Sequence, residues 1–452
     1  MTGVGTTTGA GTRGGARAGV TLGRRWNDML DAARPSVQGR LSGVVGLSLY
    51  AEGVSAAIGD VVQVESSGLP VLAEVVAVRE SGLACMPLGD VAGVRAGALV
   101  TPTGGPMVIP VGQALLGRVL DGLGRPMDDG PPLADVESVS VDGTSPHPLR
   151  RARIEEQLSL GVRALDALVP CGRGQRLGVF AGSGVGKSSL LSMIARGTEA
   201  EVSVIALIGE RGREVREFIE NDLGPEGLAR SVVVVATSDE PPLVRLRAAF
   251  VATRIAEYFR DRGSHVVLMM DSITRFAMAQ REVGLSVGEP PATRGYPPSV
   301  FALMPKLLER AGAAEIGSIT GLYTVLVEGD DMNEPIADTA RSILDGHVVL
   351  TRRLATSGHF PSIDVLESVS RVVGAVTTPA QREDATALRR MLAAHRDARE
   401  LIEIGAYAPG SNPLVDTALR LNSRIDAFLR QDIMAVTPAE QAWNWLHDLV
   451  AA

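Results

Sequence analysis

The chain has 452 residues, of which 45% are hydrophobic and 21% are charged, and its net charge is −8. This length exceeds one ordinary core and predicts about two or three domains. No apolar run approaches the roughly 18 residues of a membrane-spanning helix, and residues 1–25 hold no apolar block like that of an export signal. The acidic balance argues against a broadly basic nucleic-acid-binding surface. Two cysteines, Cys85 and Cys171, are too few for a disulfide framework, which fits a reducing cytoplasm.

The first 36 residues are rich in glycine and threonine. They are predicted to form a flexible tail followed by a short amphipathic helix over 24–34, which presents Trp26, Met29 and Leu30 on one face.

From 37 to 103 the sequence consists of short β-rich pieces that glycines separate at close intervals. This spacing predicts a small antiparallel barrel or sandwich. The candidate strands are Val44–Tyr50, Val61–Val64 and Val71–Val78.

Candidate strands and helices alternate beyond Pro110, which is the pattern of a mostly parallel sheet with helices on its faces. Several of the strands are continuous apolar runs, as buried parallel strands are. They are Leu177–Phe180, Val202–Leu207, Ser231–Ala236, Val266–Met270 and Tyr323–Leu326.

The segment from 378 to the end is predicted to be helical. Its first helix has residues at helical spacing, namely Leu388, Met391, Leu392 and His395. The last helix is expected to start with Thr437 as its cap, Pro438 in the first turn and Glu440 three residues after the cap.

A glycine-rich turn follows the strand at 177–180 and predicts a phosphate-binding (Walker A) loop. Its glycines let successive backbone N–H groups point inward around phosphate oxygens. Lys187 adds a positive charge for the β- and γ-phosphates, and the Ser188 hydroxyl is suited to bind Mg²⁺. The following helix would direct its positive N-terminal end at the phosphates. The predicted ATP-binding residues here are Gly182, Ser183, Gly184, Val185, Gly186, Lys187, Ser188 and Ser189.

Two carboxylates stand at the ends of apolar strands. Asp271 ends one strand, and beside a phosphate loop such an aspartate orients magnesium and its waters. Glu210 follows another strand, where a carboxylate can align and polarise the water that attacks a phosphoanhydride. The bland alternatives are a turn aspartate and a solvated charged loop. We predict Asp271 as a metal ligand and Glu210 as the group that activates water.

Together the motifs resemble the catalytic subunits of the rotary ATP synthases, and most closely the flagellar export ATPase and the type III secretion ATPases. The resemblance covers nearly the whole chain beyond residue 37. It implies an α/β fold with an N-terminal small β-barrel (37–103), a P-loop (RecA-like) ATPase domain with a mostly parallel sheet (104–377) and a C-terminal helical domain (378–452). Its motifs are Gly117–Pro126, Cys171–Arg176, Ala181–Ser188, Gly209–Glu214, Asp271–Phe276 and Ser368–Arg371.

The resemblance also implies roles for single residues. Glu210 is similar to the water-activating glutamate, where non-catalytic subunits of the synthases carry glutamine. Arg211 resembles an arginine near the nucleotide phosphates, and Arg275 resembles a γ-phosphate contact. Arg371 resembles the arginine finger that one subunit inserts into its neighbour's site, which contributes on the order of 10³–10⁵ in rate. For any single arginine the alternative is a surface salt bridge.

Two aromatic residues are the candidates for adenine recognition. Phe360 occupies the place where relatives put a ring against the base, and Tyr407 is expected to form a second wall from the C-terminal domain. Either ring could instead belong to a hydrophobic core.

A finger supplied by a neighbour requires an oligomer. The resemblance implies a homohexamer that hydrolyses Mg-ATP at its subunit interfaces, with the C-terminal helices facing a central stalk protein or the export gate. It further implies export chaperone–cargo complexes as partners and a cytoplasmic location, peripheral to the inner face of the cell membrane. A stator-like regulatory protein would bind the N-terminus, where Trp26, Met29 and Leu30 form the candidate docking face. Packing of this face on the chain's own barrel is the alternative.

The motif Met332–Pro335 favours the flagellar branch, so we expect a flagellar protein export ATPase. A virulence-type secretion ATPase is the runner-up, and a synthase catalytic subunit comes third. A hexameric nucleic-acid translocase and a structural subunit without turnover belong to other classes. The acidic balance and the lack of an aromatic-basic RNA-binding sheet weigh against the translocase, and Glu210 weighs against an inactive subunit.

Overall fold

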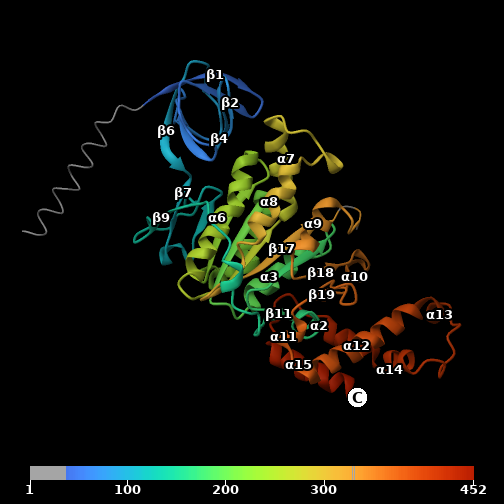
Figure 1. The fold of residues 1–452 in the computed structure, drawn as a ribbon. Coiled ribbons are helices and arrows are strands. Elements are labelled where there is room, and N and C mark those ends of the chain that lie inside the picture. Colours follow the sequence, from blue (N-terminus) through green and yellow to red (C-terminus); the bar gives the residue numbers. More distant parts are fainter. Residues whose placement is uncertain (1–36, 328, 330) are drawn as a thin grey trace, which may run out of the picture.

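The computed structural model describes residues 37–327, 329 and 331–452. Three parts follow one another along the molecule: a barrel, a central sheet covered by helices, and a group of C-terminal helices (Figure 1). The helix predicted over 24–34 lies outside the described residues. No helix within the described ranges is long and apolar enough to cross a membrane.

The N-terminal strands form a closed antiparallel barrel in the order β1-β2-β5-β4-β3-β6. Of the two folds predicted for this region, the barrel is therefore confirmed and the sandwich is excluded. The predicted strand Val44–Tyr50 is wrong, since it is the hairpin that joins two strands. Gly46 takes a left-handed φ of 56° and turns the chain between them. The strands are β1 (Gly39–Val45), β2 (Ser48–Glu52), β3 (Asp60–Val64), β4 (Val71–Arg79), β5 (Gly82–Pro87) and β6 (Leu99–Pro106).

The central sheet has nine strands in the order β19-β18-β12-β17-β15-β13-β14-β8, with β16 paired on β17. Its pairs are parallel except β18 with β19 and β16 with β17. The five predicted strands are confirmed, each extended by at least one residue. The strands are β8 (Val119–Asp121), β12 (Arg176–Ala181), β13 (Val202–Glu210), β14 (Ser231–Thr237), β15 (His265–Asp271), β16 (Gly312–Ala313), β17 (Ser318–Leu326), β18 (Gly346–Leu350) and β19 (Val369–Ser370).

Two small sheets accompany the central one. They pair β7 (Val108–Val111) with β9 (Glu137–Ser140) and β10 (Gln157–Leu158) with β11 (Cys171–Gly172). Short helical turns occur at η1 (Gln113–Leu115), η2 (Pro148–Arg150) and η4 (Thr293–Gly295).

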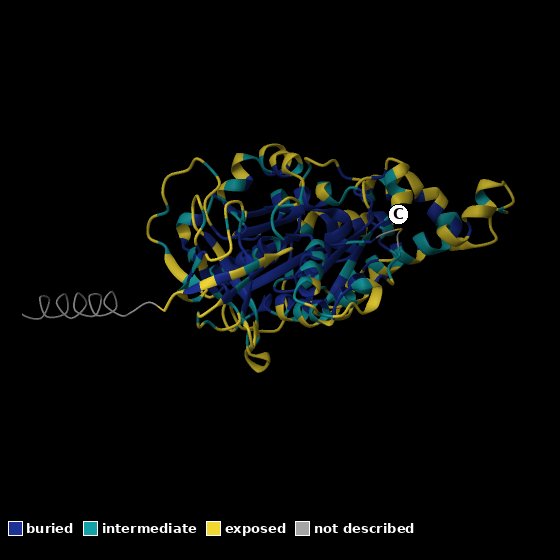
Figure 2. Cartoon of the chain, turned by 90° about the horizontal axis from the view of Figure 1, so that it is seen from above, coloured by how far each residue is buried: buried dark blue, intermediate teal, exposed yellow. Residues whose placement is uncertain are grey.

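Helices cover both faces of the central sheet, whose strands are buried (Figure 2). Val204 and Ala206 of β13 pack in one core with α6 and α7, whereas Ile205 and Leu207 pack in a second core with α3. Because both faces are buried, the strand reads as a continuous apolar run. The helices are α2 (Arg163–Leu168), α3 (Lys187–Gly197), α4 (Gly212–Glu217), η3 (Phe218–Leu223), α5 (Gly224–Ala229), α6 (Pro242–Arg260), α7 (Ile273–Ser286), α8 (Pro298–Leu308), α9 (Pro335–Ile343) and α10 (Arg352–Thr356).

The C-terminal segment is helical, as predicted. Its helices are α11 (Val373–Val376), α12 (Pro379–Asp397), α13 (Arg399–Glu403), α14 (Pro413–Leu429) and α15 (Ala439–Val450). The predicted cap of the last helix is wrong, since Pro438 occupies the N-cap position and no side chain caps the helix. The Thr437 hydroxyl instead accepts a hydrogen bond from Arg163 Nη1 at 3.2 Å, and so ties the segment before α15 to α2.

A buried ion pair joins the end of α6 to the turn after α8. Arg310 donates from Nε and Nη2 to the two carboxylate oxygens of Glu257, both at 2.7 Å, and the side chains are 3% and 1% exposed. Removing one partner of such a pair leaves a charge buried without compensation.

Replacing Glu257 with leucine is therefore expected to lower the free energy of unfolding by about 3–5 kcal/mol, measured by urea denaturation. Adding Arg310→Met removes the uncompensated charge and should recover a large part of that loss. The control is Arg216→Met, which breaks an exposed pair with Glu220 and should change stability by less than about 1 kcal/mol. A Glu257→Leu chain as stable as this control would contradict the assignment.

Candidate active site

The phosphate-loop segment joins β12 to α3. Gly184 and Gly186 have left-handed φ angles of 74° and 93°, so the glycines that the sequence supplies are needed for this backbone. Gly186 is the N-cap residue of α3 and no side chain caps the helix, which leaves the first N–H groups facing outward for an anion. The Ser362 hydroxyl donates to the Val185 carbonyl and so holds the loop.

Lys187 meets both predicted carboxylates at the carboxyl edge of the sheet. Its Nζ lies 2.5 Å from Asp271 Oδ1 and 3.4 Å from Glu210 Oε1. Thr324 of β17 donates its hydroxyl to Asp271 Oδ1 at 2.7 Å. The residues come from four neighbouring elements, because the carboxyl ends of parallel strands share one edge. Sequence reasoning missed Thr324 and Ser362, whose hydroxyl groups acquire their roles only through partners distant in the sequence.

The charges of this cluster depend on one another. Burial disfavours the charged form of Lys187, but Asp271 and Glu210 outweigh it and raise the pKa of the ammonium group. Burial also raises the pKa of Glu210, and the negative charge of Asp271 adds to this while Lys187 opposes it. A glutamate with a raised pKa is a stronger base than an exposed one, which suits a group that polarises water.

The oxygen atoms needed for a magnesium ion gather beside the loop. Ser188 is exposed in the first turn of α3, and together with Asp271 and Glu210 it lines a cavity of about 250 Å³. Hydroxyl and carboxylate oxygens are the ligands that Mg²⁺ prefers in proteins. The residues present therefore fit this ion.

Glu210 is aimed by an irregularity in its own strand. The pairing of β13 with β14 shifts register between Ile208 and Glu210, and Gly209 between them has a φ of 70°. A Cβ atom at Gly209 would lie 3.1–3.2 Å from the aliphatic carbons of Arg275 on α7. Glycine thus allows the turn and also the close approach of Arg275.

Replacing Gly209 with alanine is expected to reduce kcat at least about tenfold, because strain of roughly 1–3 kcal/mol displaces Glu210 or Arg275. The measurement is steady-state ATP hydrolysis. The matched control is Gly212→Ala, where a Cβ meets nothing within 4 Å and the φ is ordinary, so activity should be unchanged. Equal activities of the two variants would contradict this role of Gly209.

The guanidinium group of Arg275 is only partly hydrogen-bonded. Its Nε is buried without a hydrogen-bond partner among the described residues, and Nη1 contacts only the sulfur of Met278, at 3.8 Å. A buried guanidinium nitrogen without a partner is costly unless an anion meets it. This environment fits the predicted contact with a γ-phosphate.

Phe360 and Tyr407 lie in different places. A Cβ at Gly186 would lie 3.4 Å from the Phe360 ring, which is 46% exposed beside the phosphate loop. The Tyr407 hydroxyl instead bonds to the Asn412 carbonyl in its own loop and to Asp416 in the first turn of α14. That loop joins α13 to α14 at the outer end of the C-terminal helices, away from α3 (Figure 1). The structure does not bring Tyr407 to Phe360.

A different C-terminal segment lies beside Phe360. The backbone N–H of Gln431 donates to the Phe360 carbonyl at 3.0 Å, and the Arg196 side chain of α3 donates to the carbonyl of Ile433. Met434 in this segment is 64% exposed. Sequence reasoning chose Tyr407 because it is aromatic, whereas the neighbouring segment 431–436 has no aromatic residue to draw attention.

Arg211 and Arg371 are both exposed. The Arg211 side chain is 78% exposed and pairs with Glu214 at 3.3 Å. Arg371 follows β19 and its Nη2 donates to the Arg341 carbonyl at 3.3 Å. Since β19 pairs with the first two residues of β18, Arg371 lies at the amino edge of the parallel strands, opposite the phosphate loop. The length of β12, about 17 Å at ~3.3 Å per residue, separates the two edges.

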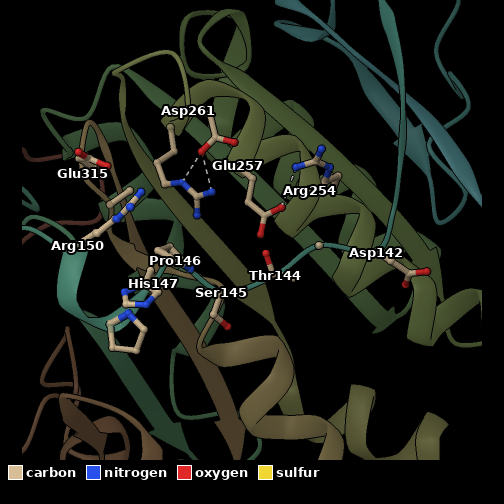
Figure 3. A pocket seen from close by; sticks show the side chains of 14 residues that line it. Asp142, Thr144, Ser145, Pro146, His147, Arg150, Arg254, Glu257, Asp261 and Glu315 are labelled. Atoms are coloured by element: carbon tan, nitrogen blue, oxygen red, sulfur yellow. Dashed lines mark hydrogen bonds and ion pairs between the residues drawn. The ribbon is translucent and has the colours of Figure 1, made fainter.

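A larger cavity, of about 810 Å³, lies elsewhere, between residues 142–150 and the end of α6 (Figure 3). Two ion pairs lie in its lining, Glu257 with Arg254 and Asp261 with Arg260. Its lining residues do not include the glycine-rich loop, so it is not the phosphate site that the sequence predicts.

Comparison with protein families gives three matches in chain order. Residues 41–104 match the β-barrel domain of the ATP synthase alpha/beta family, and 161–370 match the nucleotide-binding domain of that family. Residues 377–448 match the C-terminal domain of the type III secretion ATPase EscN.

Individual proteins agree over most of their length. The chain is 51% identical to the flagellum-specific ATP synthase of Bacillus subtilis, over 87% of this chain and 90% of the relative. It is 51% identical to the protein of the same name from Salmonella typhimurium, over 90% and 94%. Identity to a type 3 secretion system ATPase of Sinorhizobium fredii is 46%, over 92% of both chains.

Solved structures are similar as well. The assembled ATPase EscN from the enteropathogenic Escherichia coli type III secretion system has a TM-score of 0.87 and 46% identity, covering 91% of this chain and all of that one. A structure of assembled EscN with its central stalk EscO has a TM-score of 0.84 and 45% identity, with the same coverage.

Proposed function

The chain belongs to the ATP synthase alpha/beta family, among its flagellum-specific and type III secretion ATPases, and we propose that it hydrolyses Mg-ATP to energise protein export through a flagellar apparatus. The observation that carries the proposal is the cluster of Lys187, Asp271 and Glu210 beside the glycine-rich loop. It combines a phosphate-binding cation, a metal-binding carboxylate and a carboxylate suited to activate water.

Each residue has a part in the reaction. The loop from Gly182 to Ser189 binds the phosphates through backbone N–H groups, and Lys187 neutralises charge on the β- and γ-phosphates. Ser188 and Asp271 would hold the magnesium ion, which would supply positive charge to offset the charge of the phosphates. Glu210 accepts a hydrogen bond from the attacking water and orients it toward the γ-phosphorus.

Arginines complete the site. Arg275 contacts the γ-phosphate, and Arg211 lies near the phosphates once its exposed side chain turns inward.

Adenine is recognised by Phe360, whose ring stacks on the base. Tyr407 is no longer proposed as the second wall of the adenine pocket, because its hydrogen bonds hold it in the loop between α13 and α14.

The site is shared between subunits in this proposal. Arg371 lies at the edge of the sheet opposite its own phosphate loop, so it cannot reach the phosphates bound there. In a homohexamer it instead enters the site of the neighbouring subunit and neutralises charge in the transition state. The assembled EscN structures support such a ring, and the EscO complex supports a central stalk partner.

The remaining assignments follow from the family. We propose the domains 37–103, 104–377 and 378–452, of which the first forms the crown of the ring and the last faces the stalk and export gate. A stator-like protein at the N-terminus and chaperone–cargo complexes are the further partners. The protein works in the cytoplasm, at the inner face of the membrane.

A virulence-type secretion ATPase is the second candidate, because a type 3 secretion system ATPase of Xanthomonas euvesicatoria is 50% identical over 87% of this chain. A deletion in the source organism separates the two. Loss of swimming and of secreted flagellar proteins, restored by the unchanged chain and not by Glu210→Gln, is the expected result. Normal flagella in the deletion strain would contradict the flagellar role.

A further inference from the structure

A buried glutamine stands at the amino end of β12, the strand that leads into the phosphate loop. Gln175 is 0% exposed and lies in the turn between β11 and β12. It belongs to the motif Cys171–Arg176, none of whose residues has a part in the reaction described above. A fully buried amide must find hydrogen-bond partners, and the partners of this one indicate what it does.

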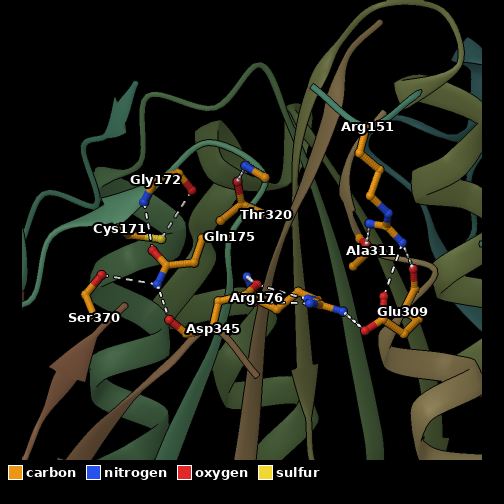
Figure 4. Close-up of polar contacts among 11 residues, drawn as sticks. Arg151, Cys171, Gly172, Gln175, Arg176, Glu309, Ala311, Thr320, Asp345 and Ser370 are labelled. Atoms are coloured by element: carbon orange, nitrogen blue, oxygen red, sulfur yellow. Dashed lines mark hydrogen bonds and ion pairs between the residues drawn. The ribbon is translucent and has the colours of Figure 1, made fainter. Parts of the chain in front are cut away.

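Three hydrogen bonds hold the Gln175 side chain (Figure 4). Its Oε1 accepts from the backbone N–H of Gly172 at 2.9 Å, and this bond fixes the Gln175 side chain within its own turn. Its Nε2 donates to the Asp345 carbonyl at 2.9 Å and to the Ser370 hydroxyl at 3.2 Å. Both Nε2 partners lie beside Arg371 in the fold, because Ser370 precedes it and Asp345 binds its backbone.

Asp345 is the centre of this arrangement. Its carbonyl accepts from the backbone amide of Arg371 at 3.0 Å as well as from Gln175. Its carboxylate accepts from Arg176 Nε at 3.0 Å and Nη2 at 3.1 Å, so it is fastened to the first residue of β12. The backbone position of Arg371 is thus set by Asp345, and Asp345 is held by β12 and Gln175.

The strand that carries Arg371 has little support of its own. β19 is an edge strand of two residues, which pair with Gly346 and His347 of β18. Two serine side chains add hydrogen bonds that hold this short strand in place. The Ser368 hydroxyl accepts from the backbone N–H of Val349 at 2.9 Å, and the Ser370 hydroxyl accepts from Gln175 Nε2. Ser368 and Ser370 are buried while Val369 and Arg371 are exposed, the alternation of a strand.

We propose that Gln175 is a positioning residue for Arg371. It fixes β19 against the amino end of β12, so that the arginine projects from the subunit at a defined place. β12 leads into the subunit's own phosphate loop. Gln175 therefore connects Arg371, which acts in the neighbouring subunit's site, with the nucleotide site of its own subunit. This inference rests on the proposed role of Arg371 in the neighbour's site.

The test replaces Gln175 with leucine, which has a similar volume and no hydrogen-bonding group. We expect kcat for ATP to fall about 10- to 100-fold with an unchanged KM, because the finger is misplaced while the variant's own phosphate loop stays intact. The control is Gln280→Leu, which removes another buried glutamine amide that donates to a serine, at 2.9 Å, and should leave kcat unchanged.

Mixed rings distinguish a misplaced finger from general damage. Chains with Lys187→Ala lack a working phosphate loop but carry a normal Arg371, so rings mixed from Gln175→Leu and Lys187→Ala chains should hydrolyse ATP faster than rings of either variant alone. If Gln175→Leu forms no ring, Ser370→Ala, which removes the same hydrogen bond from the finger strand, takes its place in both measurements.

Two results would overturn the inference: a normal kcat, or a low kcat that mixing does not restore. Arg371→Ala is measured alongside. If that variant is inactive while the Gln175 and Ser370 variants are normal, only the positioning role fails. If Arg371→Ala itself turns over normally, the proposed function of the finger fails instead.

Discussion

Replacing Glu210 with glutamine is expected to lower kcat by about 10²–10⁴-fold while the affinity for ATP changes by no more than about threefold. The amide keeps the shape and the hydrogen-bonding reach of the side chain but cannot serve as a base. Because Lys187 would keep its contact with Asp271, the phosphate-binding cation stays in place. Steady-state hydrolysis and equilibrium binding of a fluorescent ATP analogue measure the two quantities.

The matched control is Glu220→Gln, which alters an exposed glutamate in the segment that follows the same strand. Its activity should equal that of the unchanged chain. Normal turnover of Glu210→Gln, or loss of turnover together with loss of nucleotide binding, would show that Glu210 is not the group that activates water.

Replacing Arg371 with alanine is expected to reduce kcat by on the order of 10³–10⁵-fold with little effect on stability. The Arg371 side chain is exposed, and the substitution removes its hydrogen bond to the Arg341 carbonyl of the same subunit. Urea denaturation and ring assembly should therefore match those of the unchanged chain.

Arg396→Ala is the control for loss of an exposed arginine, here one that pairs with Glu367. It should retain full activity. Arg371→Lys keeps the charge but not the planar, forked geometry, so it should recover a small part of the lost rate. Full activity of Arg371→Ala would remove the finger from the mechanism.

Local patterns predicted much of the fold and of the phosphate site. The strands of the central sheet are apolar runs because both faces are buried, and the glycines at 184 and 186 are required by left-handed backbone angles within one turn. Such features depend on neighbours in the sequence and can be read without knowing the rest of the structure.

The two wrong predictions have different physical causes. Thr437 has the sequence context of a helix cap, but its hydroxyl accepts a hydrogen bond from Arg163, which is distant in the sequence. Val44–Tyr50 is largely apolar, yet Gly46 turns it into a hairpin. The structure places Tyr407 in the loop between α13 and α14, whereas the segment beside Phe360 begins at Gln431.

The roles of Thr324 and Gln175 were likewise out of reach of the sequence. Thr324 binds Asp271 of a neighbouring strand, and Gln175 binds Ser370 and Asp345, which lie far away along the chain. A hydroxyl or amide carries no signal in the sequence until the sheet order is known.

The central claim is that one active site is built from two subunits, and rings mixed from Lys187→Ala and Arg371→Ala chains test it most directly. Each variant alone lacks one half of every site. In a mixed ring, the intact loop of an Arg371→Ala chain meets the intact arginine of a Lys187→Ala neighbour, so ATP hydrolysis is expected to reappear. Mixed rings that assemble and remain as inactive as their parents would contradict the claim.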